Sequence, residues 1–200
     1  FVINDNNNFT VYPRDIIANL PYNGETKSFD AKNALGLAAL VNCVNNGEND
    51  FAGFTVTLSE DIDLQGVDFQ PIGTADNKFN GTFDGQGKTI SNLKIENDNM
   101  GAMFAYVGAN TVIKNFKLEN VNIKAKFAAG ILSEGNDNVV VEDITVSGNV
   151  EGDSYAAGIV CLNSYNEDPA VVIKNCVNNA TVSGNRSGGI AAWLTGNSVI

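Results

Sequence analysis

The chain has no histidine, only two methionines, one tryptophan and four prolines, and its 23 acidic residues outnumber its 12 lysines and arginines. The resulting net charge of -11 argues against nucleic acid or an anionic membrane as a partner, because both would repel an acidic surface. The acidic residues are dispersed along the sequence, so we expect them to serve solubility. Apolar residues make up 44% of the 200 residues, which is enough for a folded core and argues against disorder.

Cysteine is also scarce. Cys43, Cys161 and Cys176 have neither the spacing of a zinc site nor the arrangement of a disulfide framework. A cysteine nucleophile needs a base nearby, and the chain has no histidine to provide one. We therefore expect Cys161 and Cys176 to be free thiols, Cys176 to be a small core residue, and the chain to bind no metal and no cofactor.

No segment has the length and apolarity of a membrane span, so we expect no membrane insertion by this chain. Residue 1 is Phe rather than Met, which suggests a processed or engineered fragment. At the other end, residues 198–200 align with residues 171–173 in the repeat described next. From this alignment we expect the repeat either to continue beyond Ile200 or to pair there with another chain.

The stretch from residue 69 to residue 95 contains short alternating segments between sharp corners. Its apolar residues Ile90, Leu93 and Ile95 slip out of period-two alternation at Asn92. A corner at Asn92 explains the slip, because asparagine tolerates the left-handed backbone conformation better than other residues that carry a Cβ. The thirty asparagines of the chain fit a fold with many such corners.

Three later segments repeat this pattern of apolar residues around an Asn or Asp. The corner residues of the four segments, which we expect to stack in one column, are Asn92, Asn115, Asp143 and Asn175. The positions expected to face one continuous core are Val56, Leu58, Ile62, Leu64, Ile90, Leu93, Ile95, Ile113, Phe116, Leu118, Val141, Ile144, Val146 and Ile173.

A second cassette, made of small residues followed by apolar ones, accompanies the first. It starts at Gly101, Ala129, Ala157 and Gly188, so its spacing is 28, 28 and 31 residues. A fixed period of this size that carries short strands is the signature of a solenoid, whose units cannot bury their apolar faces alone. A β-sandwich gives no reason for Asn or Asp to return at one corner. The sequence therefore predicts an all-β solenoid with roughly five turns.

The order of these motifs resembles a known family. The run PIG…FNGTFDGQGKTISNLKI, followed by the small-residue cassettes, is similar to bacterial surface proteins with the GLUG motif, first noted in IgA-peptidase and adhesin-type proteins. The resemblance covers about Phe54 to the C-terminus and implies a right-handed parallel β-helix. It departs from the family pattern at Phe69, where a Trp is typical, and at the last glycine of the cassette. Small residues replace that glycine, namely Ala105, Ser133, Cys161 and Ala192.

The region before the repeats divides into two parts. Residues 1–28 lack the cassettes and form an N-terminal strand and linker segment in our interpretation. Residues 29–53 hold a predicted amphipathic helix and a loop, with the helical period running from about Asp30 to Asn46 and Gly47 as the stop. We expect this helix to cover the apolar end and the unpaired strand edge of the β-helix, which occupies residues 54–200.

Residues that could carry chemistry are few. Asp61 and Asp63 share a strand face without forming the loop cage that a cation needs, so we expect a solvated strand edge there. Residues 84–87 (DGQG) lack the Lys-Ser/Thr pair and the helix of a phosphate loop and are predicted to be a turn. The densest acidic group is Glu134, Asp137, Glu142 and Asp143. Enzymes that cleave polysaccharides use paired carboxylates, but Asp143 is better explained as a corner residue, and we expect no catalytic site.

Three aromatic residues near the cassettes, Tyr155, Tyr165 and Trp193, are candidate ligand-binding residues, because an aromatic row on a flat sheet can stack on sugar rings.

The resemblance and the lack of a catalytic constellation favour a non-catalytic extracellular or cell-surface module for adhesion or display. Its partner would be a host or surface ligand, for which a glycan is one candidate. The alternatives are a module that binds or degrades carbohydrate and an ice-binding face. The latter needs stacked threonine pairs, and only Thr55 and Thr57 offer one.

Overall fold

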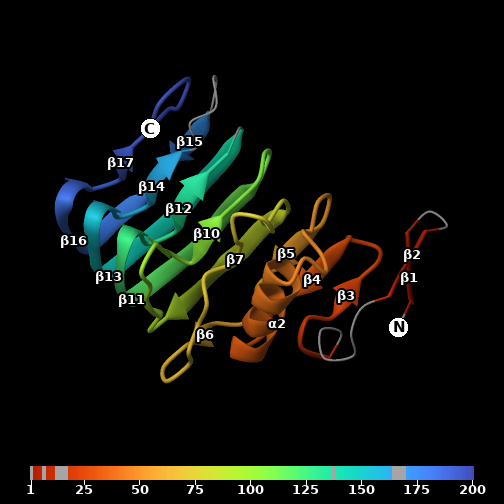
Figure 1. Cartoon of the computed structure of the whole chain (residues 1–200). Helices are drawn as coiled ribbons and strands as arrows, with labels where there is room; N and C mark the ends of the chain where they lie inside the picture. The colour runs from red at the N-terminus through yellow and green to blue at the C-terminus, as the bar shows by residue number, and fades with distance from the viewer. Residues whose placement is uncertain (1, 6–7, 12–17, 137, 164–169) are drawn as a thin grey trace.

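A computed structural model describes residues 2–5, 8–11, 18–136, 138–163 and 170–200. The chain forms a parallel β-solenoid of about six turns, which confirms the predicted parallel β-helix (Figure 1). Before the solenoid, two strands pair antiparallel, β1 (Val2–Asp5) and β2 (Asn8–Val11). Within the described residues, no helix is long and apolar enough to cross a membrane.

The larger sheet has eleven described strands, and its main path runs β15-β13-β11-β7-β5-β4-β3. The strands on this path are β3 (Tyr22–Asn23), β4 (Ser28–Asp30), β5 (Thr55–Thr57), β7 (Thr82–Ser91), β11 (Val112–Ala129), β13 (Val139–Ala157) and β15 (Val171–Lys174). The remaining strands of this sheet are β6 (Ile62–Asp63), β8 (Lys94–Glu96), β9 (Met100–Gly101) and β16 (Val177–Gly188). All of its pairings are parallel except that of β3 with β4.

A second, smaller sheet closes the solenoid. Its strands are β10 (Phe104–Tyr106), β12 (Leu132–Gly135), β14 (Val160–Asn163) and β17 (Ala191–Trp193). The register partners across this sheet are Phe104, Leu132, Val160 and Ala191, which confirms the predicted spacing of 28, 28 and 31 residues. At the last coil, Val199 bridges to Val172, as the sequence alignment of these segments predicts.

The corners of the coils are built on asparagine. Asn92, Asn115 and Asn175 have φ angles of 60°, 63° and 53°, and Asp143 has a φ of 56°, so all four corner residues adopt the left-handed conformation. Strands β11 and β13 continue through such corners, and each bends around the core without losing its pairing to the neighbouring coils. The left-handed corner lets one long strand contribute to more than one face of the solenoid.

The stacking of the corner residues differs from the prediction. Asn115 and Asp143 lie opposite each other, and Asn175 donates to Asp143 at 3.0 Å, but Asn92 belongs to a different column. Asn92 donates to Asp63 at 2.7 Å and accepts from Asn120, its neighbour in the next coil.

In the preceding coil Asp84 pairs with Lys114, and its Oδ1 accepts from Asn115 Nδ2 at 3.2 Å. Asn115 alone makes its corner, whereas the three residues Gly85, Gln86 and Gly87 make the equivalent corner of the preceding coil. The sequence alignment of Asn92 with Asn115 is therefore wrong by one corner. The first two segments therefore look alike in sequence but turn at different corners.

The core is continuous along the solenoid. All fourteen positions that the sequence predicts to face inward are buried, and none exposes more than 3% of its surface. A chain of phenylalanine rings runs through the N-terminal half of this core, with successive centroids 5.1 to 6.0 Å apart. Its members, in order of contact, are Phe29, Phe51, Phe79, Phe104, Phe83 and Phe116. Such ring pairs contribute about 0.5–1.5 kcal/mol each beyond the apolar area that they bury.

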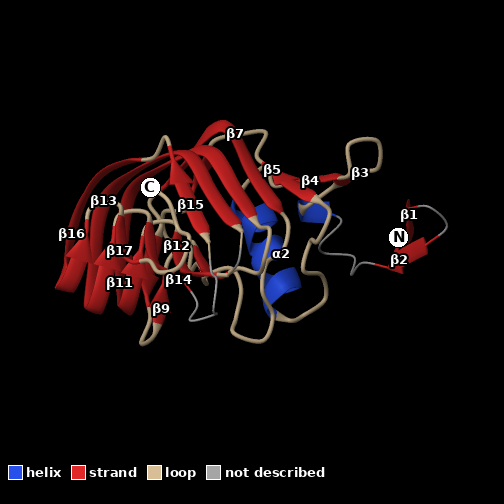
Figure 2. Ribbon diagram, turned by 90° about the horizontal axis from the view of Figure 1, so that it is seen from above, coloured by secondary structure: helices blue, strands red, loops and turns tan. Residues whose placement is uncertain are grey.

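The helix α2 (Ala34–Asn45) lies at the N-terminal end of the solenoid, between β4 and β5 along the chain (Figure 2). Asn33 caps it by accepting from the backbone N–H of Gly36 at 3.1 Å. Its buried face includes Leu37, Val41 and Val44, as the helical period of the sequence predicts. The parallel sheet begins before Phe54, because β4 already pairs with β5.

The end of α2 completes the edge of the smaller sheet. Asn45 Nδ2 donates to the carbonyl of Pro71 at 3.0 Å, and its Oδ1 accepts from the backbone N–H of Gly73 at 2.7 Å. Pro71 and Gly73 flank Ile72, which bridges to Phe104 of β10. The carboxamide of Asn45 thus takes the place of the peptide group of a further strand and satisfies the backbone groups at this sheet edge. The predicted capping helix was expected to cover such an edge.

Replacing Asn115 with valine should lower the free energy of unfolding by about 1–3 kcal/mol, because a β-branched residue is strained at a φ of 63°. Urea denaturation of both proteins measures this difference. Asn115→Gly is the matched control, and it should lose less stability, because glycine adopts positive φ freely. Equal losses in the two variants would show that the corner does not depend on the left-handed conformation.

Replacing Asn45 with alanine should cost about 1–3 kcal/mol, because the buried carbonyl of Pro71 and N–H of Gly73 would lose their partner. Thermal and urea denaturation report the loss. Asn42→Ala, at an exposed site on the same helix, should have no such effect. An Asn45→Ala variant as stable as the parent chain would contradict the role of this side chain as an edge partner.

Candidate functional site

One column of side chains follows the ends of successive strands along the solenoid axis. Met100 in β9 pairs with Phe127 in β11, Phe127 with Tyr155 in β13, and Tyr155 with Arg186 in β16. Adjacent strands of a sheet lie about 4.8 Å apart, so this column presents one side chain per rung. We call these four residues the first wall.

A second column lies on the smaller sheet. Tyr106 of β10 pairs with Glu134 of β12, Glu134 with Leu162 of β14, and Leu162 with Trp193 of β17. Trp193 exposes 37% of its surface. We call these four residues the second wall. Its last member, Trp193, contacts Tyr155 and Arg186 of the first wall directly.

Small residues lie where the two walls meet. Ala102, Ala129 and Cys161 form a buried cluster separate from the main core, and Phe127, Tyr155, Leu162 and Ala192 pack against it. Ser133 and Cys161 point back to the first wall, with Oγ of Ser133 3.5 Å from the carbonyl of Phe127 and Sγ of Cys161 3.7 Å from that of Tyr155. Small residues at these cassette positions thus leave room for the aromatic rings beside them. We call the two walls and these small residues the aromatic corner.

The aromatic rings and a cation are in contact across the aromatic corner. The rings of Phe127 and Tyr155 are stacked with centroids 5.9 Å apart, and Trp193 meets Tyr155 edge-on at 5.5 Å. The guanidinium of Arg186 lies 5.1 Å from the Tyr155 centroid and 5.9 Å from that of Trp193, and it donates to the Tyr155 hydroxyl. Lys126 places its Nζ 5.2 Å from the Phe127 centroid. These contacts hold two cations against the rings.

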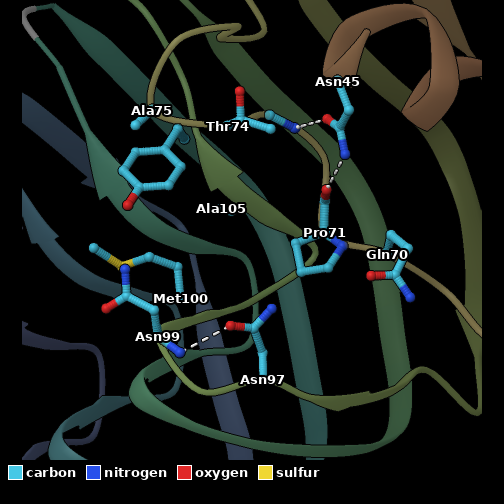
Figure 3. Close-up of a pocket in the computed structure, with 11 residues that line it drawn as sticks. Asn45, Gln70, Pro71, Thr74, Ala75, Asn97, Asn99, Met100 and Ala105 are labelled. Carbon is cyan, nitrogen blue, oxygen red and sulfur yellow. Dashed lines mark hydrogen bonds between the residues drawn. The ribbon is translucent and has the colours of Figure 1, made fainter.

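A pocket of about 310 Å³ with both polar and apolar lining continues the aromatic corner at its N-terminal end (Figure 3). Met100 and Tyr106, one from each wall, line this pocket together with the amides and hydroxyl of Asn97, Asn99, Gln70 and Thr74. Asn97 Oδ1 accepts from the backbone N–H of Asn99 at 2.8 Å, which fixes the loop before β9. Amide and hydroxyl groups of this kind form hydrogen bonds with the hydroxyls of a bound sugar.

Glu134 pairs with Tyr106, a residue that lines this pocket. Burial raises the pKa of Glu134 above the usual 4.5, and the nearby Lys78 opposes that shift. Burial, and next the carboxylate of Glu134, raise the pKa of Tyr106. Glu134 is therefore a partly desolvated carboxyl group beside a tyrosine, and it prefers its neutral form more than a solvated glutamate does.

The other members of the predicted acidic group do not join Glu134. Glu142 forms an ion pair with Lys174 at 2.6 Å, Asp143 accepts from Asn175, and Asp137 lies outside the described residues. The described residues contain no cluster of three or more acidic or cysteine side chains that could hold a metal ion. The paired carboxylates of a glycoside hydrolase are thus not assembled from the described part of this group.

The remaining candidates have structural contacts. Asp61 accepts a hydrogen bond from the backbone N–H of Thr89 at 2.8 Å. Asp63 accepts one from the backbone N–H of Gln65 and one from the side chain of Asn92. These hydrogen bonds, from Asn92 first and Gln65 next, lower the pKa of Asp63. In the DGQG segment, Asp84 accepts from the N–H of Gln86 at 2.9 Å, as a turn requires.

The three cysteines are free thiols, as predicted. Burial raises the pKa of Cys43 and of Cys161 to about 12, and burial also raises the pKa of Cys176. Cys176 is only half-buried, whereas the sequence predicts a core position. A thiol with a raised pKa is a poor nucleophile at neutral pH, so these cysteines act as small apolar residues.

Of the aromatic candidates, Tyr155 and Trp193 meet in the aromatic corner, while Tyr165 lies outside the described residues. Sequence reasoning missed Phe127, Arg186 and the pocket amides. The sequence carries a signal for two of them, because Phe127 and Tyr155 each stand directly before an Ala-Ala-Gly-Ile sequence, and Arg186 stands at the equivalent place before Gly189-Ile190. The pocket amides come from loops without such a repeat.

Comparison with solved structures shows the same fold in a protein described as "a putative immunoglobulin A1 protease from Bacteroides ovatus". The TM-score is 0.68 and the sequence identity is 24%, over 84% of this chain and 53% of that one. This chain is also 33% identical to halomucin of Haloquadratum walsbyi over 99 residues. The match covers 48% of this chain and 1% of halomucin. No family model matches the chain. The chain thus spans only part of each protein that it resembles, and the structural likeness establishes a shared β-solenoid.

Replacing Glu134 with glutamine should make the chain more stable than the parent at pH 7, and this gain should shrink toward pH 4. The raised pKa of Glu134 means that the folded state favours the protonated form, so its stabilising contribution is present below pH 4.5 and is lost as the pH rises through the folded-state pKa. Urea denaturation at both pH values measures the difference. Glu142→Gln should give no gain at pH 7, because Glu142 is paired with Lys174. A Glu134→Gln variant without a gain at pH 7 would contradict the desolvation of this carboxyl group.

Proposed function

We propose that this chain is a non-catalytic β-helix module of an extracellular or cell-surface bacterial protein, used for adhesion or display. Such a module presents its lateral faces to a partner, because side chains fill its interior from Phe29 to Ile173. A solenoid of stacked coils offers long, repetitive faces of this kind.

The observation that carries this proposal is the structural use of the described carboxylates. Asp61, Asp63 and Asp84 accept hydrogen bonds that shape turns and corners, Asp143 joins the corner column, and Glu142 is bound to Lys174. A carboxylate that is engaged by a structural hydrogen bond or ion pair is poorly placed to exchange protons with a substrate. The acidic residues thus maintain the solenoid and its solubility.

The comparisons support an extracellular setting. One protein is named halomucin, and the Bacteroides ovatus protein is described as "a putative immunoglobulin A1 protease". A mucin and an immunoglobulin protease are names that fit a setting outside the cell. Together with the resemblance to GLUG-motif surface proteins, they favour a surface or secreted location for this module.

A carbohydrate-active module is the second candidate, and the aromatic corner favours it. Tyr155 and Trp193 offer rings, the adjoining pocket offers amides, and Glu134 is a carboxyl group with a raised pKa, as a general acid requires. Catalysis of glycoside hydrolysis requires a second carboxyl group across the substrate, whereas binding does not. This candidate therefore divides into a binding form and a cleaving form.

An assay of turnover tests the non-catalytic role. The purified chain, incubated with immunoglobulin A1 and with a panel of polysaccharides, should release no new fragments by mass spectrometry and reducing-end analysis. Beads coated with the chain should adhere to epithelial cells more than beads coated with serum albumin. Turnover that disappears in the Glu134→Gln variant would overturn the non-catalytic role, and beads that fail to adhere would contradict the adhesive one.

A further inference from the structure

We propose that the aromatic corner and its pocket form one extended binding site for a carboxylated polysaccharide, a chain of pyranose rings that carry carboxylate groups. This inference rests on the proposed function in one respect, because it assumes that the module binds its ligand without cleaving it. It adds a site and a class of ligand, and it follows from the shape, the rings and the charges of this part of the surface.

The site runs along the solenoid axis and crosses four rungs. Its two walls extend from Met100 and Tyr106, which line the pocket, to Arg186 and Trp193 in the last coil. Since the rungs repeat about every 4.8 Å, an extended polymer lying along the walls meets one side chain of each wall at each rung. A polymer suits such a site better than a compact ligand, which would occupy one rung only.

The aromatic side chains supply the apolar contact that sugar rings need. Trp193 is the most exposed ring of the aromatic corner, at 37%, and Tyr155 and Phe127 are half-buried beside it. Exposed large apolar side chains are otherwise few in the described chain, where the remaining ones are Leu35, Val177, Val199 and Ile200. Trp193 lies at 69° to the Tyr155 ring, so its exposed indole is the ring on which a pyranose can stack.

The charges of the site select an acidic ligand. Arg186 and Lys126 both lie over rings of the first wall, in a chain whose net charge is -11. Among the described residues, neither cation has a carboxylate within ion-pair distance, whereas Lys114, Lys124 and Lys174 do. The planar guanidinium of Arg186 offers five donors, and the hydroxyl of Tyr155 uses one side of it. The remaining donors can bind a carboxylate in the bidentate geometry that arginine favours.

The site also has a direction. In the second wall Glu134 is one rung from Tyr106 and two rungs from Trp193, and a carboxylate of the ligand placed next to it would be repelled whenever Glu134 is ionised. The pocket end, with Asn97, Asn99 and Gln70, therefore suits the hydroxyls of a sugar, and the Arg186 end suits its carboxylate. The polysaccharide chain would therefore place a carboxylate at the last rung, beside Arg186.

Calorimetric titration with alginate oligosaccharides tests the proposal. The folded chain should bind them, and it should bind the same oligosaccharides much more weakly once their carboxyl groups are converted to methyl esters. Dextran sulfate serves as a polyanion without carboxylates. It should bind more weakly than alginate, because stacking and bidentate geometry, rather than charge alone, provide the affinity in the proposed site.

Two substitutions locate the binding. Arg186→Gln and Trp193→Ala should each weaken alginate binding about tenfold, since each removes an interaction worth roughly 1.4 kcal/mol. The matched controls are Lys117→Gln, an exposed lysine on the outer face of β11, and Leu35→Ala, an exposed apolar residue on α2, and neither should change the affinity. Urea denaturation shows whether each variant is folded. If Trp193→Ala fails to fold, Trp193→Phe should fold and keep most of the affinity.

The outcomes separate this proposal from the proposed function. Equal affinity for alginate and its ester, equal loss in Lys117→Gln and Arg186→Gln, or no alginate binding would each overturn the assignment of the site. None of these results would involve turnover, so the non-catalytic role would stand. Cleavage of alginate would instead overturn that role while leaving the site in place.

Discussion

Each coil of this solenoid must turn several times within about 28 residues while its backbone stays paired with the coils on both sides. Left-handed corners meet this constraint. Ten described residues other than glycine have positive φ angles, and six of them are asparagines, with Asp143 as a close chemical substitute. A short polar side chain tolerates this conformation and can also bond to the corner of the next coil, as Asn175 does with Asp143. The corners are thus both turns and links between coils.

The same geometry creates the aromatic corner. Where the end of β11 or β13 turns into the smaller sheet, the chain encloses a small apolar cluster outside the main core. Alanine, serine and cysteine at the cassette positions leave the space that Phe127 and Tyr155 occupy. Because the coils repeat, each rung adds a side chain to the same wall, and a ladder of single residues becomes an elongated surface. Repetition of the coil therefore builds the elongated surface on which we propose a site for a repetitive ligand.

The carboxylates of the solenoid and the two cations of the aromatic corner have different roles. Several described carboxylates of the solenoid accept hydrogen bonds at corners or pair with lysines, and the uncompensated negative charge keeps the chain soluble. Lys126 and Arg186 are held against aromatic rings instead, where their charge is available to a ligand. In an acidic protein, a local pair of cations of this kind determines which anion can approach closely.

Sequence periodicity was sufficient to predict the β-helix, the spacing of the smaller sheet, the inward residues and the helix at the N-terminal end. These features depend on local patterns, because apolar alternation and the Asn corners act within a few residues. Tertiary structure alone decided which corner each asparagine occupies, since Gly85 to Gly87 fill a corner that Asn115 turns by itself. It also decided that Phe127, Tyr155, Arg186 and Trp193 meet, because residues about 30 positions apart come together only when the coils stack in register.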